Sequence, residues 1–203
     1  MLPKYKTQIL NTFWNSCVDN ALGALSEMIK KEVKITKSSI NIEPLNRVPE
    51  LMDHIETSNL ILYTKVAGNP KYVILLCSPL KHYLRLIDML LHMKIDYYEA
   101  LNEENEAVVL ELGNIINGYI ISSLNHLFDT KFNFDKTEIS TNPFRVVEDF
   151  GFGNIYKEKI NVLAFNSVFK VNSESIEGKL ILLTERDKVD IILDRISNKL
   201  KVV

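Results

Sequence analysis

The sequence lacks the features that direct proteins to nucleic acid or to metal ions. Acidic and basic side chains nearly balance, giving a formal net charge of -2, and no stripe of lysine and arginine interleaved with aromatic residues is present. The chain therefore has no overall positive field to attract a phosphate backbone. Its two cysteines, Cys17 and Cys77, show no metal-ligand spacing and lie in apolar segments, which predicts buried free thiols. No cluster of carboxylates indicates a metal ion or another cofactor of the chain's own.

Long apolar runs are also missing. The longest are far shorter than the roughly 20 residues that span a bilayer, and no apolar segment of a signal peptide follows the first six residues. With 46% hydrophobic and 25% charged residues, the composition is that of a soluble globular protein. We therefore expect a cytoplasmic protein with reduced thiols that does not insert into membranes.

A long helix is predicted from Glu106 to His126, where a narrow polar stripe crosses an apolar segment. Glu111 and Asn114 lie one turn apart on this stripe, and a carboxylate and a carboxamide on a rigid helix can position a water molecule or pair with a lysine. The stripe consists of Glu111, Asn114, Gly118, Ser122 and Asn125. The apolar positions, which we expect to be buried, are Val108, Leu112, Ile115, Ile116, Tyr119, Ile120, Leu124 and Leu127.

The same stripe occurs ninety-nine residues earlier on a second amphipathic helix, residues 7–30. Its members are Thr12, Asn15, Asp19, Gly23 and Ser26. The pattern downstream repeats as well. In each half it predicts two short strands (32–35 and 40–42; 131–134 and one at Ile139), a loop (44–58; 143–154), a hairpin (60–66 with 72–77; 160–171 with 179–183) and a closing helix (79–93; 185–200).

The repeat predicts the class of fold. Its halves span about 7–95 and 99–201, joined by a connector at 97–105. We expect residues 1–203 to form one α/β (α+β) domain with internal pseudo-two-fold symmetry and a largely antiparallel sheet flanked by helices.

Two such stripes about a hundred residues apart resemble the helices of the CheC/CheX/FliY family of chemotaxis phosphatases. The segment Glu111-Leu-Gly-Asn114-Ile-Ile-Asn-Gly118 resembles that family's E-[IL]-G-N-I-x-x-G helix. Asn15 followed by Ala24-Leu25-Ser26 resembles its N-x(8)-A-L-S ending, and residues 175–183 resemble a glycine-containing hairpin of the family. Chain length and repeat spacing are most similar to a CheC protein with two sites.

The first site departs from the family pattern more than the second. Thr12 stands where the family has glutamate, Trp14 where it has a small glycine, and Asp19 where it has a small residue. We interpret the first site as degenerate, and Trp14 as either a core residue or an exposed partner anchor. In the second site, Ala107 replaces the usual Asp or Ser, and Thr137 stands where the family often has proline. The central pair, Glu111 and Asn114, is intact.

The resemblance implies hydrolysis of the phosphoaspartate of the response regulator CheY. Asn114 would hold a water in line with the phosphorus, Glu111 would pair with the regulator's active-site lysine, and the Mg²⁺ would be the regulator's own. Gly118 and Ser122 would contact the partner. The alternative is a CheC-like adaptor that binds phospho-CheY, or a CheD-type deamidase, with little turnover.

Overall fold

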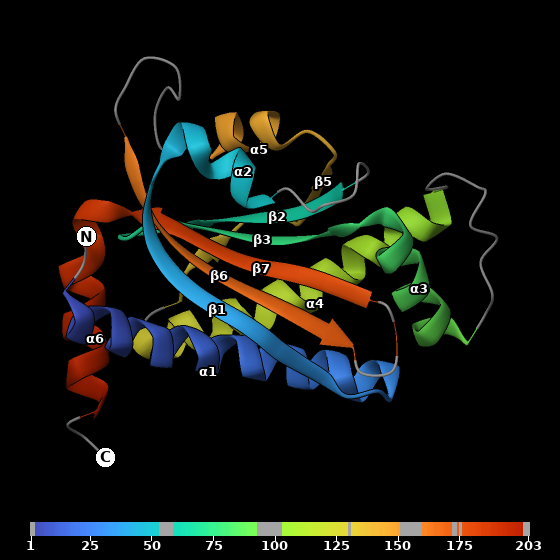
Figure 1. The fold of residues 1–203 in the computed structure, drawn as a ribbon, viewed down its shortest axis with the longest axis horizontal. Helices are drawn as coiled ribbons and strands as arrows, with labels where there is room; N and C mark the ends of the chain where they lie inside the picture. The colour runs from blue at the N-terminus through green and yellow to red at the C-terminus, as the bar shows by residue number, and fades with distance from the viewer. Residues whose placement is uncertain are drawn as a thin grey trace.

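A computed structural model describes residues 3–52, 59–92, 103–129, 131–150, 160–171, 174 and 176–200 (Figure 1). In chain order its elements are α1 (Lys4–Ile29), β1 (Val33–Pro44), the 3-10 helix η1 (Leu45–Arg47), α2 (Val48–Met52), β2 (Asn59–Ala67), β3 (Tyr72–Pro79), α3 (Leu80–Leu91), α4 (Glu103–Phe128), β4 (Asn133–Phe134), β5 (Glu138–Ser140), α5 (Pro143–Asp149), β6 (Asn161–Val171), β7 (Ile176–Glu185), the 3-10 helix η2 (Arg186–Lys188) and α6 (Val189–Leu200).

Helix termini follow from local residues. α1 and α3 each follow a proline, Pro3 and Pro79, whose fixed φ suits the start of a helix. Both end at a residue in the left-handed conformation, Lys30 and His92, which closes a helix because its backbone cannot continue the turn. The short helix α5 begins at Asn142, whose side-chain oxygen accepts hydrogen bonds from two of the first backbone N–H groups.

The sheet is antiparallel and combines strands from both halves of the chain. Its order is β1-β6-β7-β3-β2-β4, with β5 also paired to β2. The order reads the same from either edge once β1 is matched to β4 and β5, β6 to β2, and β7 to β3. β1 of the first half pairs with the hairpin of the second, and β4 and β5 pair with the hairpin of the first. The predicted antiparallel sheet with internal pseudo-two-fold symmetry is therefore confirmed.

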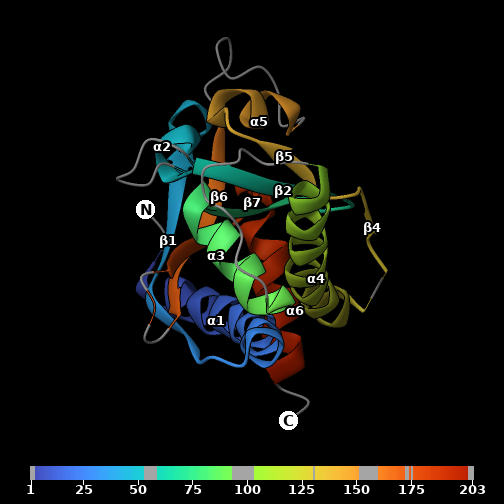
Figure 2. The ribbon, with the colours of Figure 1, turned by 90° about the vertical axis from the view of Figure 1, so that its right-hand side faces the viewer.

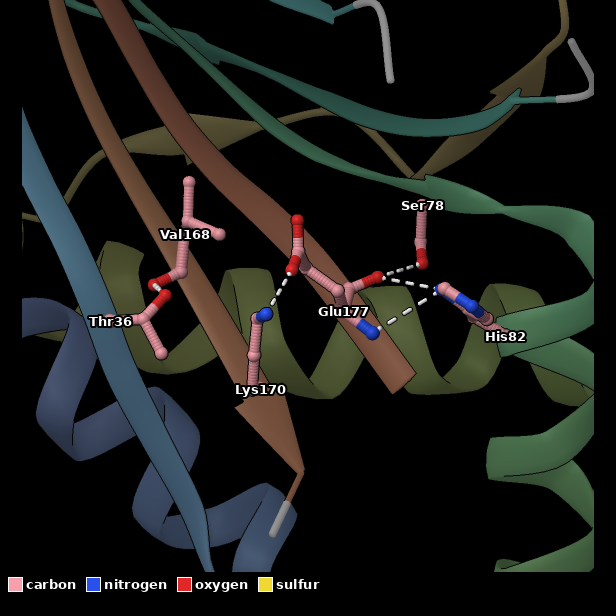
Figure 3. Close-up of polar contacts among 6 residues, drawn as sticks. All are labelled: Thr36, Ser78, His82, Val168, Lys170 and Glu177. Carbon is pink, nitrogen blue, oxygen red and sulfur yellow. Dashed lines mark hydrogen bonds and ion pairs between the residues drawn. The ribbon is translucent and has the colours of Figure 1, made fainter. Parts of the chain in front are cut away.

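Side-chain hydrogen bonds repeat about the same axis. Where β3 and β7 meet, the Ser78 hydroxyl donates to the Glu177 carbonyl at 2.6 Å, and the Thr184 hydroxyl donates to the Lys71 carbonyl at 2.7 Å. Figure 3 shows the first of these contacts with the His82 ring, whose Nδ1 lies 3.0 Å from the same carbonyl. These bonds tie together the two strands at the centre of the sheet, so the halves share one continuous layer.

Helices cover both faces of the sheet. α1, α3, α4 and α6 lie against one face, and the short helices α2 and α5 lie against the other (Figures 1 and 2). Every residue of β3 is buried, because alternate side chains enter the two cores. Tyr72, Ile74 and Leu76 belong to the core under the long helices. The continuous apolar run of β3 is thus the signature of a strand covered on both sides.

One helix, from Asn105 to Phe128 of α4, is long and apolar enough to cross a membrane by length and composition alone. Its apolar side is packed in the core under the sheet, through residues such as Val109, Leu112 and Ile116. The polar stripe lies on the other side. This arrangement accounts for the composition of α4 as that of a core helix.

Several predicted elements differ from those observed. The two short strands at 32–35 and 40–42 are one strand, β1, because a bulge between Ile35 and Lys37 restores the inward alternation after a polar stretch. The loop at 44–58 contains η1 and α2, which are too short to show helical periodicity, and its residues 53–58 lie outside the described residues. The loop after Pro143 begins with α5, and its residues 151–154 also lie outside them.

The connector at 97–105 was only partly placed by its composition. Its last three residues, Glu103–Asn105, belong to α4, and residues 97–102 lie outside the described part of the chain. The first turn of α4 is polar, so the sequence does not distinguish it from a loop.

Candidate functional site

The predicted second site is exposed on α4. Glu111 and Asn114 are both exposed and lie one turn apart, and Ser122 is exposed two turns further along. Gly118 between them is partly exposed. The helix runs beside β2, the strand next to the sheet edge formed by β4 and β5 (Figure 2). The stripe is therefore available to a partner from Glu111 to Ser122, whereas Asn125 is partly buried and its Oδ1 accepts a hydrogen bond from the Phe132 N–H at 2.8 Å.

Gly113 sets how closely α4 approaches the sheet. A β-carbon placed on Gly113 would lie 2.9 Å from Thr137 Cγ2 and 3.0 Å from Leu62 Cδ1, shorter than side chains tolerate. Only glycine fits this contact without a shift of its neighbours. The close approach brings the segment before β5 to the base of the next residue, Asn114.

The carboxamide of Asn114 is oriented by the backbone. Its Oδ1 accepts a long hydrogen bond, 3.4 Å, from the backbone N–H of Thr137. Only the amide oxygen can accept from an N–H, so this contact also fixes which way the group is turned. One lone pair of Oδ1 and the whole NH₂ group remain to bind a water or a substrate oxygen. A proline at position 137 would have no N–H to donate, so the threonine observed here supplies a contact that the usual family residue cannot make.

A buried polar network lies beneath this contact. The hydroxyls of Thr137 and Thr64 are 2.8 Å apart, and Asn117 Nδ2 donates to Thr64 Oγ1 at 2.9 Å. Asn117 is 1% exposed, and its Oδ1 has no hydrogen-bond partner among the described residues. Helical periodicity places position 117 with the apolar residues, so pattern analysis missed it. The repeat offered a signal, because the equivalent position in the first half is the apolar Val18, and an asparagine at 117 departs from it.

A second set of bonds holds β5 in place. The single proton of the Tyr63 hydroxyl is shared between Glu138 at 2.8 Å and Asp149 at 3.2 Å, and Lys65 pairs with Glu138 at 3.4 Å. Burial and the adjacent Glu138 carboxylate raise the pKa of Tyr63 well above its usual value, so the phenol stays a donor. Because Glu138 follows Thr137 directly, these contacts also fix the N–H that Asn114 accepts.

The first site is built differently. Trp14 is fully buried and packs on Phe165, with ring centroids 5.8 Å apart. It is therefore a core residue, which settles the alternative left open by the sequence. Asn15 is only partly exposed, and its Oδ1 is buried with no partner among the described residues. Thr12 is exposed, but its hydroxyl donates back to the Gln8 carbonyl at 3.1 Å.

Comparisons with known proteins identify the fold. No model of a known protein family matches the chain, and no curated protein does. FliY from Thermotoga maritima, a solved structure, superposes with a TM-score of 0.73 at 15% identity, over 98% of this chain and 99% of that one. The chain has the fold of the CheC/CheX/FliY proteins. The predicted resemblance is confirmed at the level of the fold.

Two further structures show the range of proteins with this CheC-like fold. CheX from Borrelia burgdorferi, solved as a complex of CheX with CheY, BeF₃ and Mg²⁺, gives a TM-score of 0.57 at 17% identity over 86% of this chain and 97% of that one. The middle domain of FliM from H. pylori gives 0.64 at 7% identity over 96% and 99%. The fold thus occurs both in a protein that binds CheY and in the middle domain of FliM.

The exposure of one residue of α4 was predicted wrongly from the sequence. Tyr119 was expected in the core, but its side chain is 46% exposed beside Gly118 and before Ser122. Helical spacing puts it at the margin between the apolar and polar faces, where burial depends on neighbouring elements. Exposed tyrosines next to polar residues are typical of protein–protein contacts.

The remaining candidates for a chemical site are the two cysteines and the clusters of possible metal ligands. Cys17 and Cys77 are buried and form no disulfide, as predicted, and burial raises the pKa of the Cys17 thiol to about 12. Among the described residues no group of three or more His, Cys, Asp and Glu side chains is arranged to hold a metal ion.

Proposed function

We propose that this chain is a CheC-like phosphatase that hydrolyses the phosphoaspartate of a CheY-type response regulator, with α4 as its working helix. One observation carries the proposal. Glu111 and Asn114 are exposed together on a rigid helix, and the carboxamide of Asn114 is already oriented by the Thr137 N–H. The CheX–CheY complex of the same fold supports a partner of this class.

The reaction needs position more than chemical activation. An acyl phosphate is a reactive group, so the catalyst must chiefly align a water with the phosphorus, opposite the leaving carboxylate. Asn114 can accept a hydrogen bond from that water on the free lone pair of Oδ1 while its NH₂ group donates to a phosphoryl oxygen. A carboxamide does this at any physiological pH because it does not titrate. The bond from Thr137 lowers the entropy lost when the amide is fixed.

Glu111 has a different role in the proposal. Its exposed carboxylate is one turn from Asn114 and is free to form a charge-assisted hydrogen bond with a lysine in the regulator's acidic pocket. That contact sets the register of docking and places the amide over the phosphorus. The Mg²⁺ needed for the phosphoryl group is the regulator's own, and no cofactor of this chain takes part.

The docking face extends along α4 beyond the pair. A β-carbon on Gly118 would meet nothing within 4 Å, so this position leaves open space at which a partner backbone can approach. Tyr119 and Ser122 continue the face. We propose Gly118, Tyr119 and Ser122 as partner contacts, and a cytoplasmic location, where response regulators act.

The test is the lifetime of a phosphorylated regulator at substoichiometric protein. Wild type should shorten it with multiple turnovers, and Glu111→Ala and Asn114→Ala should each slow the decay about 100-fold, the range seen when a group that stabilises a transition state is removed. Glu106→Ala, which removes an exposed glutamate of the same helix away from the stripe, is the matched control and should leave the rate unchanged. Equal rates for wild type and both site variants, with wild type active, would contradict the assignment.

A second function is favoured by the first half of the chain. Thr12 in place of glutamate, and the occurrence of the fold in FliM, suit an adaptor that binds phospho-CheY or a CheD-type deamidase without hydrolysis. In that case saturable binding would leave the regulator's half-life unchanged. A pull-down with a CheD-type protein tests the other partner directly.

A further inference from the structure

A hollow lies between α1 and α4, away from Glu111 and Asn114. Its volume is about 830 Å³, and α6 closes one side through Ile196. Phe13, Cys17 and Leu127 form its inner wall; Cys17 and Leu127 are buried and Phe13 is partly buried. Sites for small molecules have volumes of roughly 300–1,000 Å³ and apolar walls with few polar groups. The hollow therefore has the size of such a site, and its inner wall is apolar.

The described lining contains no carboxylate, lysine or arginine side chain. A quarter of the chain is Asp, Glu, Lys or Arg, yet none of these residues that the structure describes lines the hollow. The Cys17 thiol on its wall stays neutral, because burial raises its pKa to about 12. A charged guest would lose hydration without gaining an ion pair, which is unfavourable. The occupant that this wall accepts is uncharged.

Two of the polar residues that line the hollow present little polarity to it. The Thr12 hydroxyl donates to the Gln8 carbonyl and the Ser123 hydroxyl donates to the Tyr119 carbonyl, each at 3.1 Å. The single proton of each hydroxyl is thereby donated to the helix backbone, and only acceptor lone pairs are left. Gln8, Asn20 and His126 are exposed at the mouth and remain to bind one polar group of a guest.

The repeat shows why the hollow is open in this place. Ser16 and Cys17 of α1 line it, and the equivalent residues of α4 are Ile115 and Ile116. Ile116 is fully buried and Ile115 is partly buried. The smaller pair on α1 leaves space that isoleucines would fill, and Ser122 and Ser123 face it from α4.

We propose that this hollow binds an uncharged, largely apolar small molecule that fits within about 830 Å³ and is held at its mouth by one hydrogen-bonding group. The site excludes the Glu111–Asn114 pair and shares only Ser122 with the proposed docking face, so it does not depend on the phosphatase proposal. A bound guest would contact both long helices, so it would also stabilise the folded protein.

The test uses two fluorescent probes that differ in one charge. N-phenyl-1-naphthylamine is uncharged, and 8-anilinonaphthalene-1-sulfonate has the same rings with a sulfonate. Titrated into the whole protein, the uncharged probe should give a saturable fluorescence increase with one site per chain. The sulfonate should bind at least about tenfold more weakly than the uncharged probe, because nothing in the wall offsets its charge. Equal or tighter binding of the sulfonate would overturn the proposal.

Substitutions locate the probe. Ser16→Ile and Ser122→Ile, each introducing bulk into the hollow, should weaken the uncharged probe about tenfold or more by steric exclusion. Ser197→Ile, the same change at a partly exposed position of α6 outside the lining, is the control and should bind as wild type does. Circular dichroism and the thermal midpoint show that each variant is folded.

The remaining outcomes are also decisive. Unchanged binding in both folded hollow variants would place the probe elsewhere and overturn the site. Binding that appears only as the protein is diluted from a dimer to a monomer would show that a second copy covers the hollow, and would overturn a small-molecule role. Loss of binding in either folded variant, with Ser197→Ile unaffected, would support the site.

Discussion

The two long helices carry side chains of opposite size at the same position of the repeat. In the second half Gly113 faces Leu62 of β2, and in the first half Trp14 faces Phe165 of the equivalent strand β6. The glycine lets strand and helix approach so closely that the Thr137 N–H reaches Asn114. The tryptophan uses that space for core packing, and the Asn15 oxygen has no partner among the described residues.

The comparison shows that a repeated polar stripe is not sufficient for a repeated site. What differs lies one residue away, on the side of the helix that faces the sheet. A small residue there gives a well-positioned amide, and a large one gives stability. The same exchange is seen deeper, where Asn117 joins the Thr64–Thr137 hydroxyls while Val18 leaves Ser38 and Ser167 paired to each other, 3.2 Å apart.

The largest expected effect is on stability in the first half. Trp14→Ala should lower the free energy of unfolding by about 3–5 kcal/mol, because it removes a fully buried indole and leaves a cavity against Phe165. Urea unfolding followed by circular dichroism measures this. Phe13→Ala, at the partly buried neighbour, is the control and should cost clearly less. A loss for Trp14→Ala below that of Phe13→Ala would show that the indole does not support the core.

The next effect separates the two asparagines. Asn114→Ala should slow regulator dephosphorylation about 100-fold, and Asn15→Ala should change it less than about twofold, because only Asn114 is exposed and oriented by a backbone N–H. The measurement is the decay of a phosphorylated regulator with each variant at equal concentration. Comparable losses in both variants would mean that the first site also works.

Gly113→Ala tests the close approach directly. The added methyl would meet Thr137 and Leu62 at about the distances given above, so we expect a loss of about 1–3 kcal/mol in the free energy of unfolding and a slower phosphatase. Both follow from α4 moving away from β5. Full activity together with unchanged stability would show that Gly113 does not set the position of Asn114.

The smallest expected effect compares two helical glycines, the exposed Gly23 and the partly exposed Gly118. Gly118→Ala and Gly23→Ala should each raise the free energy of unfolding by about 0.5–1 kcal/mol, since neither β-carbon meets a neighbour and alanine favours the helix. Only Gly118→Ala should weaken binding of the regulator, measured by titration calorimetry. Weakening by Gly23→Ala to the same degree would place the partner on α1 as well.

Much of the architecture was predictable from periodicity. The two long helices, both hairpins and the polar stripe of α4 follow from side-chain spacing alone, because each is long enough to show its period. The exchange of edge strands between the halves was not predictable, because strand pairing is a long-range choice that local pattern does not record. β1 was divided in two because a bulge disguises its alternation.

The site shows the same limit. Glu111, Asn114 and Ser122 were expected to be exposed and are. The Thr137 N–H and Asn117 were missed, since a backbone donor from a distant segment and a buried amide leave no periodic signal. Tyr119 was misplaced because its burial is decided by what stands next to the helix rather than by the helix itself.

The crossed pairing of the edge strands bears on how such a chain can arise. β1 completes the hairpin β6–β7, and β4 and β5 complete the hairpin β2–β3, so neither half has its own outer strand in the sheet. A chain of half this length could build the same layer only as a strand-swapped homodimer. After duplication and fusion of such a chain, only one of the two helices would be needed to form the site. Positions 14 and 113 could then diverge within one molecule.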